Sequence, residues 1–338
     1  MLIVMLVCSL PGFTQDSREA AKYMDQIGVQ YKQIQKENWD YTRAVAHSRS
    51  ARKVERKRTE LLKILRKAKQ SVKSLSSFKR DYSLRDSVVA YFDLSFTVIN
   101  EDYEKIMDME AVAEQSYDLM EAYLLAQEIA SEKLEKASLE MEQVYKAFAE
   151  KYGVNLIENK SELDKKLEKS SEALKYYNQV YLVFFKAYKQ EMYLLDAMER
   201  TDINAIEQNR NALISVADEG LEKLKTISTY KGDNSINNAC RRMLTFYKDE
   251  AENKVPVLAD FLVKMDEFKE LDKLFKSKDR MQLTKEEVDK YNKAVDEHNS
   301  GITKFNNTNN SVNSKRETNV NAWNTAVEKY MTRHIPKR

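Results

Sequence analysis

Glycine and proline are scarce in this chain: its 338 residues include six glycines and three prolines. Tight turns depend on these two residue types, and folds rich in β-strands need many such turns. Lysine and glutamate, which are good helix formers, dominate a charged fraction of 33%. Hydrophobic residues make up 42%, which is enough to fill real cores. The sequence therefore predicts an all-α protein of long helices with few connections.

A segment of twelve residues occurs twice. Residues 73–84 align without gaps on residues 225–236, with five identical positions and five conservative exchanges. Residues 23–27 also match residues 176–180, one residue out of step. Chance similarity is common between two helices but much rarer across a turn, and the twelve-residue match crosses one. We therefore predict an internal duplication.

The recurring segment has residues suited to a corner between two helices. A helix is expected to end near Phe78 in the first copy and near Tyr230 in the second, with both rings anchored in a core. Ser83 or Ser235 would then offer its hydroxyl as the N-cap of the next helix. Gly232 suits the left-handed backbone that often follows a helix.

The duplication predicts elongated tandem antiparallel helical bundles. Residues 1–15 are interpreted as a signal peptide, residues 16–155 as the first bundle and residues 156–338 as the second. Gly153 and Asn155 mark the boundary between the two bundles. In the first bundle the expected helices cover about 17–48, 52–77, 84–108 and 113–152. In the second, one helix starts at about 161, and the others cover about 203–228, about 235–276 with a kink at Pro256, and about 284–331.

The N-terminus predicts export. Residues 2–8 form a short apolar run that a Pro-Gly pair interrupts before polar sequence begins, as at the end of a signal peptide cleaved near Gln15. The destination would be the periplasm, the outer surface or the medium. A lipid on Cys8 is a second interpretation, and a buried N-terminal strand or helix end is a third. Beyond Gln15 the longest strongly apolar run, residues 181–185, is far shorter than the roughly 20 residues that span a membrane.

Basic residues concentrate between Arg49 and Lys73, where eleven Lys or Arg accompany two Glu, although the whole chain carries a net charge of only +2. Such a surface would suit lipid headgroups or nucleic acid. No aromatic residue falls between Tyr41 and Phe78 to stack on bases, so we expect no nucleic acid. Alternatively, acidic residues in 101–142 neutralise this helix within its own bundle. The candidate polyanion-binding residues are Arg49, Arg52, Lys53, Arg56, Lys57 and Arg66.

The last expected helix carries a polar stretch in its seam. His298, Asn309 and Arg316 occupy heptad positions, and eight asparagines crowd residues 306–324. These three residues are candidate contacts with a partner; alternatively, a buried polar residue fixes the register of the helices. In either case the stretch should open at a lower free energy than the helix from residue 161. The seam expected for that helix is apolar and aromatic: Leu167, Leu174, Tyr177, Tyr181, Phe184, Tyr188, Met192 and Leu195.

The sequence holds no pattern typical of catalysis or metal binding. Glu-x-x-His pairs, Gly-rich phosphate loops and Gly-x-Ser-x-Gly motifs are all missing, and the three histidines are far apart. Cys240 is the one cysteine after the leader, which excludes an internal disulfide; we expect a buried thiol rather than a reactive one. We therefore predict no enzyme, no cofactor and no metal. An unrecognised active site would instead appear as a cluster of buried carboxylates.

Two segments carry a resemblance to a known family. They are residues 78–86, FKRDYSLRD, and residues 148–153, FAEKYG. With these segments and its leader, the chain resembles a family of bacterial surface or exported helical proteins found in spirochaete and Bacteroidetes-type genomes. The similarity runs over most of the mature chain, but Arg80 stands where the family has a glycine before the corner aspartate. The resemblance implies a helical fold outside the cytoplasm and no established activity, so no functional residue is carried over.

The leading interpretation is a non-enzymatic exported or cell-surface protein that acts through contacts with a protein or with an envelope component. The alternative is a membrane-associated or pore-forming, toxin-like helical protein. That class needs an apolar hairpin that enters lipid, and the sequence shows none.

Overall fold

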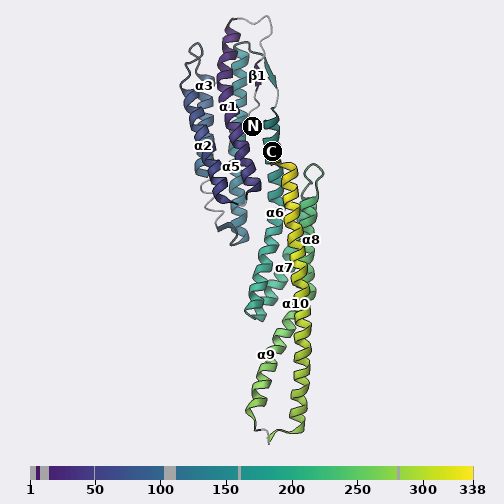
Figure 1. Cartoon of the computed structure of the whole chain (residues 1–338). Coiled ribbons are helices and arrows are strands. Elements are labelled where there is room, and N and C mark those ends of the chain that lie inside the picture. The colour runs from purple at the N-terminus through teal and green to yellow at the C-terminus, as the bar shows by residue number, and fades with distance from the viewer. Residues whose placement is uncertain are drawn as a thin grey trace. The chain divides into compact units, whose positions relative to one another are not determined.

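The protein is all-α, as predicted, with one pair of short strands (Figure 1). The computed structural model describes residues 5–7, 15–48, 50–102, 112–158, 161–279 and 282–337. The chain forms two compact units: unit 1 holds Met1–Asn178 and Glu328–Arg338, and unit 2 holds Gln179–Val327. These limits differ from the predicted bundles 16–155 and 156–338, because helices α6 and α10 each begin in one unit and end in the other.

Unit 1 is built on helices packed in chain order: α1 on α2, α2 on α3 and α3 on α5 (Figure 1). Apolar residues three or four positions apart give each helix one buried face, as Met24, Ile27 and Tyr31 do in α1. The helices are α1 (Gln15–His47), α2 (Ala51–Lys73), α3 (Ser83–Thr97), the π-helix η1 (Val98–Asp102), α5 (Tyr117–Lys151) and the first part of α6 (Glu162–Glu199).

Unit 2 contains the rest of α6 and the helices that follow it. Gly220 lets α7 approach its neighbours, because a Cβ there would lie 2.9 Å from a methyl of Leu244 and 3.2 Å from one of Val183. Cys240 is fully buried, as predicted, and burial raises the pKa of its thiol. The helices are α7 (Ile203–Thr226), α8 (Ser235–Asp249), the π-helix η2 (Glu250–Lys254), α9 (Val255–Ser277) and α10 (Lys285–His334).

The first recurring corner is a two-residue turn. The backbone N–H of Phe78 donates to the carbonyl of Asp81 over 3.1 Å, and the N–H of Asp81 donates back over 2.7 Å. Lys79 and Arg80 between them have φ values of 50° and 67°, the left-handed pair typical of a type I′ turn. Phe78 is buried in the core of unit 1, which confirms its predicted place.

The second corner repeats this turn. The N–H of Asp233 donates to the carbonyl of Tyr230 over 2.9 Å, and Lys231 and Gly232 have φ values of 51° and 79°. Gly232 therefore has the left-handed backbone that the sequence predicted. Tyr230 is only half-buried, unlike Phe78.

The predicted serine caps are wrong. Helices α3 and α8 begin at Ser83 and Ser235, so these serines lie inside the helices, and the residues before them provide no side-chain cap. The carboxylate of Asp81 accepts the backbone N–H of Ser83 over 2.8 Å, and that of Asp233 accepts the N–H of Ser235 over 2.9 Å. An aspartate that bonds two residues ahead closes the turn and satisfies the first helical N–H.

The expected kink at Pro256 takes the form of a π-helix. Helix α8 ends at Asp249, η2 follows, and α9 begins at Val255 with Pro256 in its first turn. Proline has no N–H to donate to the preceding turn, so the regular hydrogen-bond pattern stops there. Helix α3 is likewise followed by a π-helix, η1.

Strands β1 (Met5–Val7) and β2 (Leu156–Glu158) pair antiparallel over three residues each. Strand β1 lies in the predicted signal peptide, so the full chain has a strand there; the third interpretation, that this segment is buried, stays a prediction. Cleavage near Gln15 concerns the processed protein and stays a prediction; Cys8 lies outside the described residues.

Candidate functional site

Helix α2 carries the basic residues singled out in the sequence. Ser50 caps it by accepting the backbone N–H of Lys53, and one face is buried through Leu61, Leu65 and Val72. Steps of four and seven residues keep side chains on one helical face. Four cations at such steps lie on the opposite, exposed face, and we call them the α2 stripe: Arg52, Arg56, Lys63 and Lys67.

Within the part of the chain that the structure describes, little neutralises the α2 stripe. Arg56 is 66% exposed and its nearest carboxylate, Glu60, lies 3.9 Å away, a geometry that contributes little in water. Arg52, Lys63 and Lys67 form no ion pair with any residue that the structure describes. At 1.5 Å per residue, the stripe spans about 22 Å of helix.

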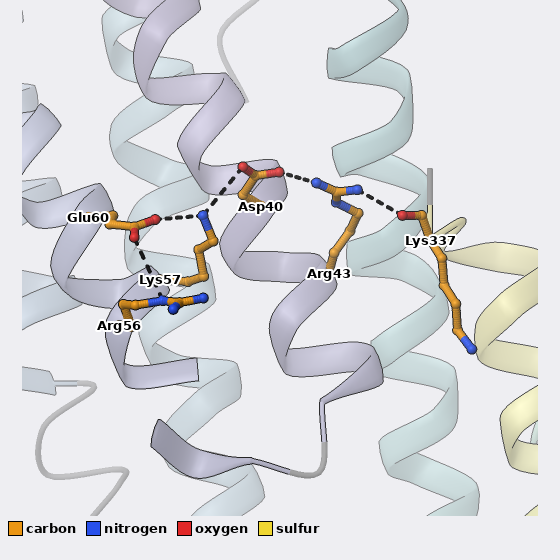
Figure 2. A network of polar contacts seen from close by, with 6 residues as sticks. All are labelled: Asp40, Arg43, Arg56, Lys57, Glu60 and Lys337. Atoms are coloured by element: carbon orange, nitrogen blue, oxygen red, sulfur yellow. Dashed lines mark hydrogen bonds and ion pairs between the residues drawn. The ribbon is translucent and has the colours of Figure 1, made fainter. Parts of the chain in front are cut away.

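Lys57 has a structural role instead (Figure 2). Its ammonium lies 2.6 Å from Glu60 and 3.7 Å from Asp40 of α1, and the bond to Glu60 raises the pKa of Lys57. Asp40 also accepts from Arg43, which donates to the carbonyl of Lys337 over 2.8 Å. This network joins α2, α1 and the C-terminal end of the chain.

The other basic residues of α2 are divided between the core and the surface. Arg58, which is buried, donates to the carbonyls of Ile99 and Asn100 in η1 over 3.1 and 3.2 Å. The guanidinium of Arg66 lies over the ring of Phe96, 5.1 Å from its centroid. Lys53 is exposed, and Arg49 lies outside the described residues.

The neutralisation of α2 by residues 101–142 is not seen in the part of that segment that the structure describes. Between described residues, the ion pairs that leave α2 are Lys57 with Asp40 of α1 and Lys69 with Asp93 of α3. Of the six candidate residues, the structure therefore leaves Arg52, Lys53 and Arg56 on an open basic face.

A second cluster lies in unit 2, where Arg316 of α10 meets two buried glutamates. Its Nε donates to Glu191 of α6 over 2.6 Å, and its Nη2 donates to Glu250 of η2 over 2.5 Å. Both glutamate side chains are 2% exposed and that of Arg316 is 19% exposed. One guanidinium thus fastens three elements of the same unit. Burial and the charge of Glu191 raise the pKa of Glu250 to about 8.

The three predicted seam residues have different surroundings. Arg316 points into unit 2 as described. The ring of His298 stacks on Phe268, with centroids 4.2 Å apart. Asn309 accepts a long hydrogen bond of 3.5 Å from Asn313. Two of the three seam positions are therefore occupied from within unit 2.

Glu191 and Glu250 were not singled out in the sequence. The expected seam passed through Met192, but Met192 is 40% exposed and Glu191 is buried in its place. The apolar and aromatic residues of this helix also fit a heptad pattern shifted by one residue, and in that pattern Glu191 faces the core. This second fit was the sign in the sequence that Glu191 could be buried. Buried carboxylates are the feature expected of an unrecognised active site; here the guanidinium of Arg316 donates to both and so links α6, η2 and α10. No group of three or more His, Cys, Asp or Glu suited to a metal occurs among the described residues.

Within the described residues, none of the helices combines the length and apolar character needed to cross a bilayer. No protein-family model, curated protein or solved structure matches the chain.

Proposed function

We propose that this is a non-enzymatic exported protein that binds an anionic component of the cell envelope through the α2 stripe. The observation that carries the proposal is the row of four exposed cations on one helical face, three of them without an ion pair among the described residues. A structural role would have given these cations carboxylate partners, as it does for Lys57 and Lys69.

The charge of the stripe sets the expected strength of binding. Each Lys or Arg near an anionic lipid surface contributes about 1 kcal/mol, so four contribute about 4 kcal/mol, roughly a thousandfold in the binding constant. This attraction reaches only about 10 Å at 0.1 M salt, so it acts on contact with the surface.

The position of the leader supports export. Helix α1 begins at Gln15, where cleavage is predicted, so removal of residues 1–15 would shorten α1 by its first residue and leave the other described helices unchanged. The destination outside the cytoplasm is part of the proposal.

We also infer that the chain arose by duplication. Three pairs of elements begin 152 residues apart: α2 and α7 at Ala51 and Ile203, α3 and α8 at Ser83 and Ser235, and η1 and η2 at Val98 and Glu250. The shared type I′ corner supports the same inference. Arg210 pairs with Glu207 in α7 at the positions that correspond to Arg58 and Glu55 in α2, so the two copies share this ion pair. The first copy differs from the second in the basic face of α2.

Co-sedimentation with vesicles tests the proposed function. Wild-type protein should bind phosphatidylcholine vesicles that contain phosphatidylglycerol and should not bind pure phosphatidylcholine. The variant R52Q/R56Q/K63Q/K67Q should lose most of this binding. The matched control is K223Q/K273Q/K290Q/K304Q, which removes the same charge from exposed positions elsewhere and should bind like wild type. Equal loss in both variants would reduce the effect to net charge and reject the stripe.

The same vesicles test the alternative of a pore-forming protein. A trapped dye should stay inside while the protein binds. Dye release that depends on the protein would favour the alternative and contradict a purely surface role.

A further inference from the structure

The cluster around Arg316 has an imbalance of buried charge. Two carboxylates and one guanidinium give a net charge of −1 if both glutamates are ionised, and both glutamate side chains are 98% hidden from water. An unbalanced buried charge is costly, and two carboxylates that share a site avoid the cost by keeping one proton. The composition of the cluster therefore calls for one bound proton.

The hydrogen bonds indicate where that proton resides. Oε1 of Glu250 accepts from Arg316, but Oε2 is buried and has no hydrogen-bond partner. A carboxylate oxygen without a donor in a dry site is unfavourable, whereas a protonated oxygen becomes a donor itself. The hydroxyl of Tyr247 is fully buried beside the two glutamates. A proton on Glu250 relieves its unpartnered oxygen.

We propose that Glu191 and Glu250 form a proton-binding site that holds one shared proton at neutral pH, and that this proton, together with Arg316, fastens the middle of α10 to α6 and η2. Loss of the proton leaves one uncompensated negative charge in the cluster. The neighbouring segment of α10 then opens more readily. The attachment of α10 to α6 and η2 in unit 2 therefore depends on pH, and this inference does not rest on the α2 stripe.

Few other ionisable groups face this site. Tyr188 and Glu191 come from α6, Tyr247 from α8 and Arg316 from α10. Glu191 and Arg316 are the charged groups that act most strongly on Glu250. At the margin, Lys315 lies 3.5 Å from Asp249, and both are about half exposed, so water screens them. Glu250 is therefore the group of this cluster that titrates.

The direction of the pH effect follows from the shift. The pKa of Glu250 is raised from 4.5 to about 8 by burial, so the folded state binds the proton more tightly than the open state does. The stabilisation is complete below about pH 4.5 and is lost as the pH rises through about 8. Between these limits the opening constant of α10 around Arg316 should rise by up to about tenfold per pH unit.

Infrared spectroscopy and hydrogen exchange test the proposal together. At pH 7 the wild-type protein should show the C=O stretch of a protonated carboxyl, which disappears in E250Q. Hydrogen exchange of residues 306–319, corrected for the intrinsic rate, should rise with pH in wild type and stay flat in E250Q. The control E252Q changes an exposed glutamate two residues away and should behave like wild type.

The infrared band of wild type needs no variant to fold, so its absence at pH 7 would overturn the proposal directly. If E250Q does not fold, E191Q provides the same comparison, because the proton belongs to the pair. The same pH dependence in wild type and in the folded glutamine variant would assign the effect to other groups and reject the site.

Discussion

Gly28 and Gly220 both lie inside helices, but their surroundings differ. A Cβ on Gly28 of α1 would meet nothing within 4 Å, whereas one on Gly220 of α7 would press on methyls of Leu244 and Val183. Glycine weakens a helix through backbone entropy, and close packing is the reason to keep it. At the scale of single residues, the structure therefore separates a dispensable glycine from a required one.

The pair makes a matched prediction. Gly28→Ala should raise the free energy of unfolding by about 0.5–1 kcal/mol, because only the entropy term changes. Gly220→Ala gains the same term but overpacks the contact of α7 with α6 and α8, which costs about 1–3 kcal/mol. Urea denaturation of both variants measures the difference. A stabilised Gly220→Ala protein would show that α7 is not held as closely as described.

Single residues also mark the limit of what the sequence could predict. The left-handed position of Gly232 follows from glycine chemistry, whereas Arg80 adopts the same conformation and only its alignment with Gly232 in the recurring segment indicated it. The prediction of serine caps was wrong because the aspartate two residues before each serine offers a stronger acceptor at the start of the helix. Local rules identified the turn; competition among its polar groups decided the bonds.

At the scale of elements, α9 and α10 form an antiparallel pair of helices (Figure 1). Aromatic rings make contacts between them. Each contact follows the previous one by seven residues on both helices, the spacing of a coiled coil. The centroid distances are 3.9 Å for Phe275 with Tyr291, 4.2 Å for Phe268 with His298 and 4.9 Å for Phe261 with Phe305. The heptad in α10 was visible in the sequence, but the partner rings in α9 required the register of the pair.

The middle contact predicts a local effect. Phe268→Ala should remove the stacking on His298 and speed hydrogen exchange in residues 263–305. The cost should stay below the roughly 3–5 kcal/mol of a fully buried phenylalanine, because Phe268 is only half-buried. Exchange around the buried Cys240 should not change. Uniform loss of protection throughout unit 2 would show that the pair of α9 and α10 does not open separately from the rest of the unit, contrary to this prediction.

The buried glutamates show why the rest of the element-scale account could not be predicted. The apolar residues of α6 fit two heptad patterns one residue apart, so the sequence of this helix alone does not decide which face is buried. Glu191 can be buried because Arg316 supplies the opposite charge, and Arg316 lies 125 residues later in the chain. No local pattern carries that pairing.

At the scale of the whole molecule, composition alone predicted the all-α class, and the structure confirms it. The limits of the compact units were not predicted, because α6 and α10 run through the division at Asn178 and Val327. The basic face of α2 was predicted by its charge, but whether it stayed open depended on which acids lay within reach.

Export makes a prediction for the processed chain. A protein that begins at Asp16 should unfold at nearly the same temperature as the full chain, because the described residues that it loses are those of β1, paired with β2 over three residues, and the first residue of α1. Calorimetry of the two forms measures this. N-terminal sequencing of protein from its native cells should also begin near Asp16. A native protein that starts at Met1 would contradict the leader.

The salt dependence of vesicle binding tests the central claim most directly. Between about 0.05 and 0.5 M salt, screening shortens from well over 10 Å to only a few ångströms, so binding through the α2 stripe should fall steeply. In R52Q/R56Q/K63Q/K67Q the residual binding should be weak and nearly independent of salt. The account predicts this loss of slope; equal binding and equal slopes in wild type and variant would contradict it.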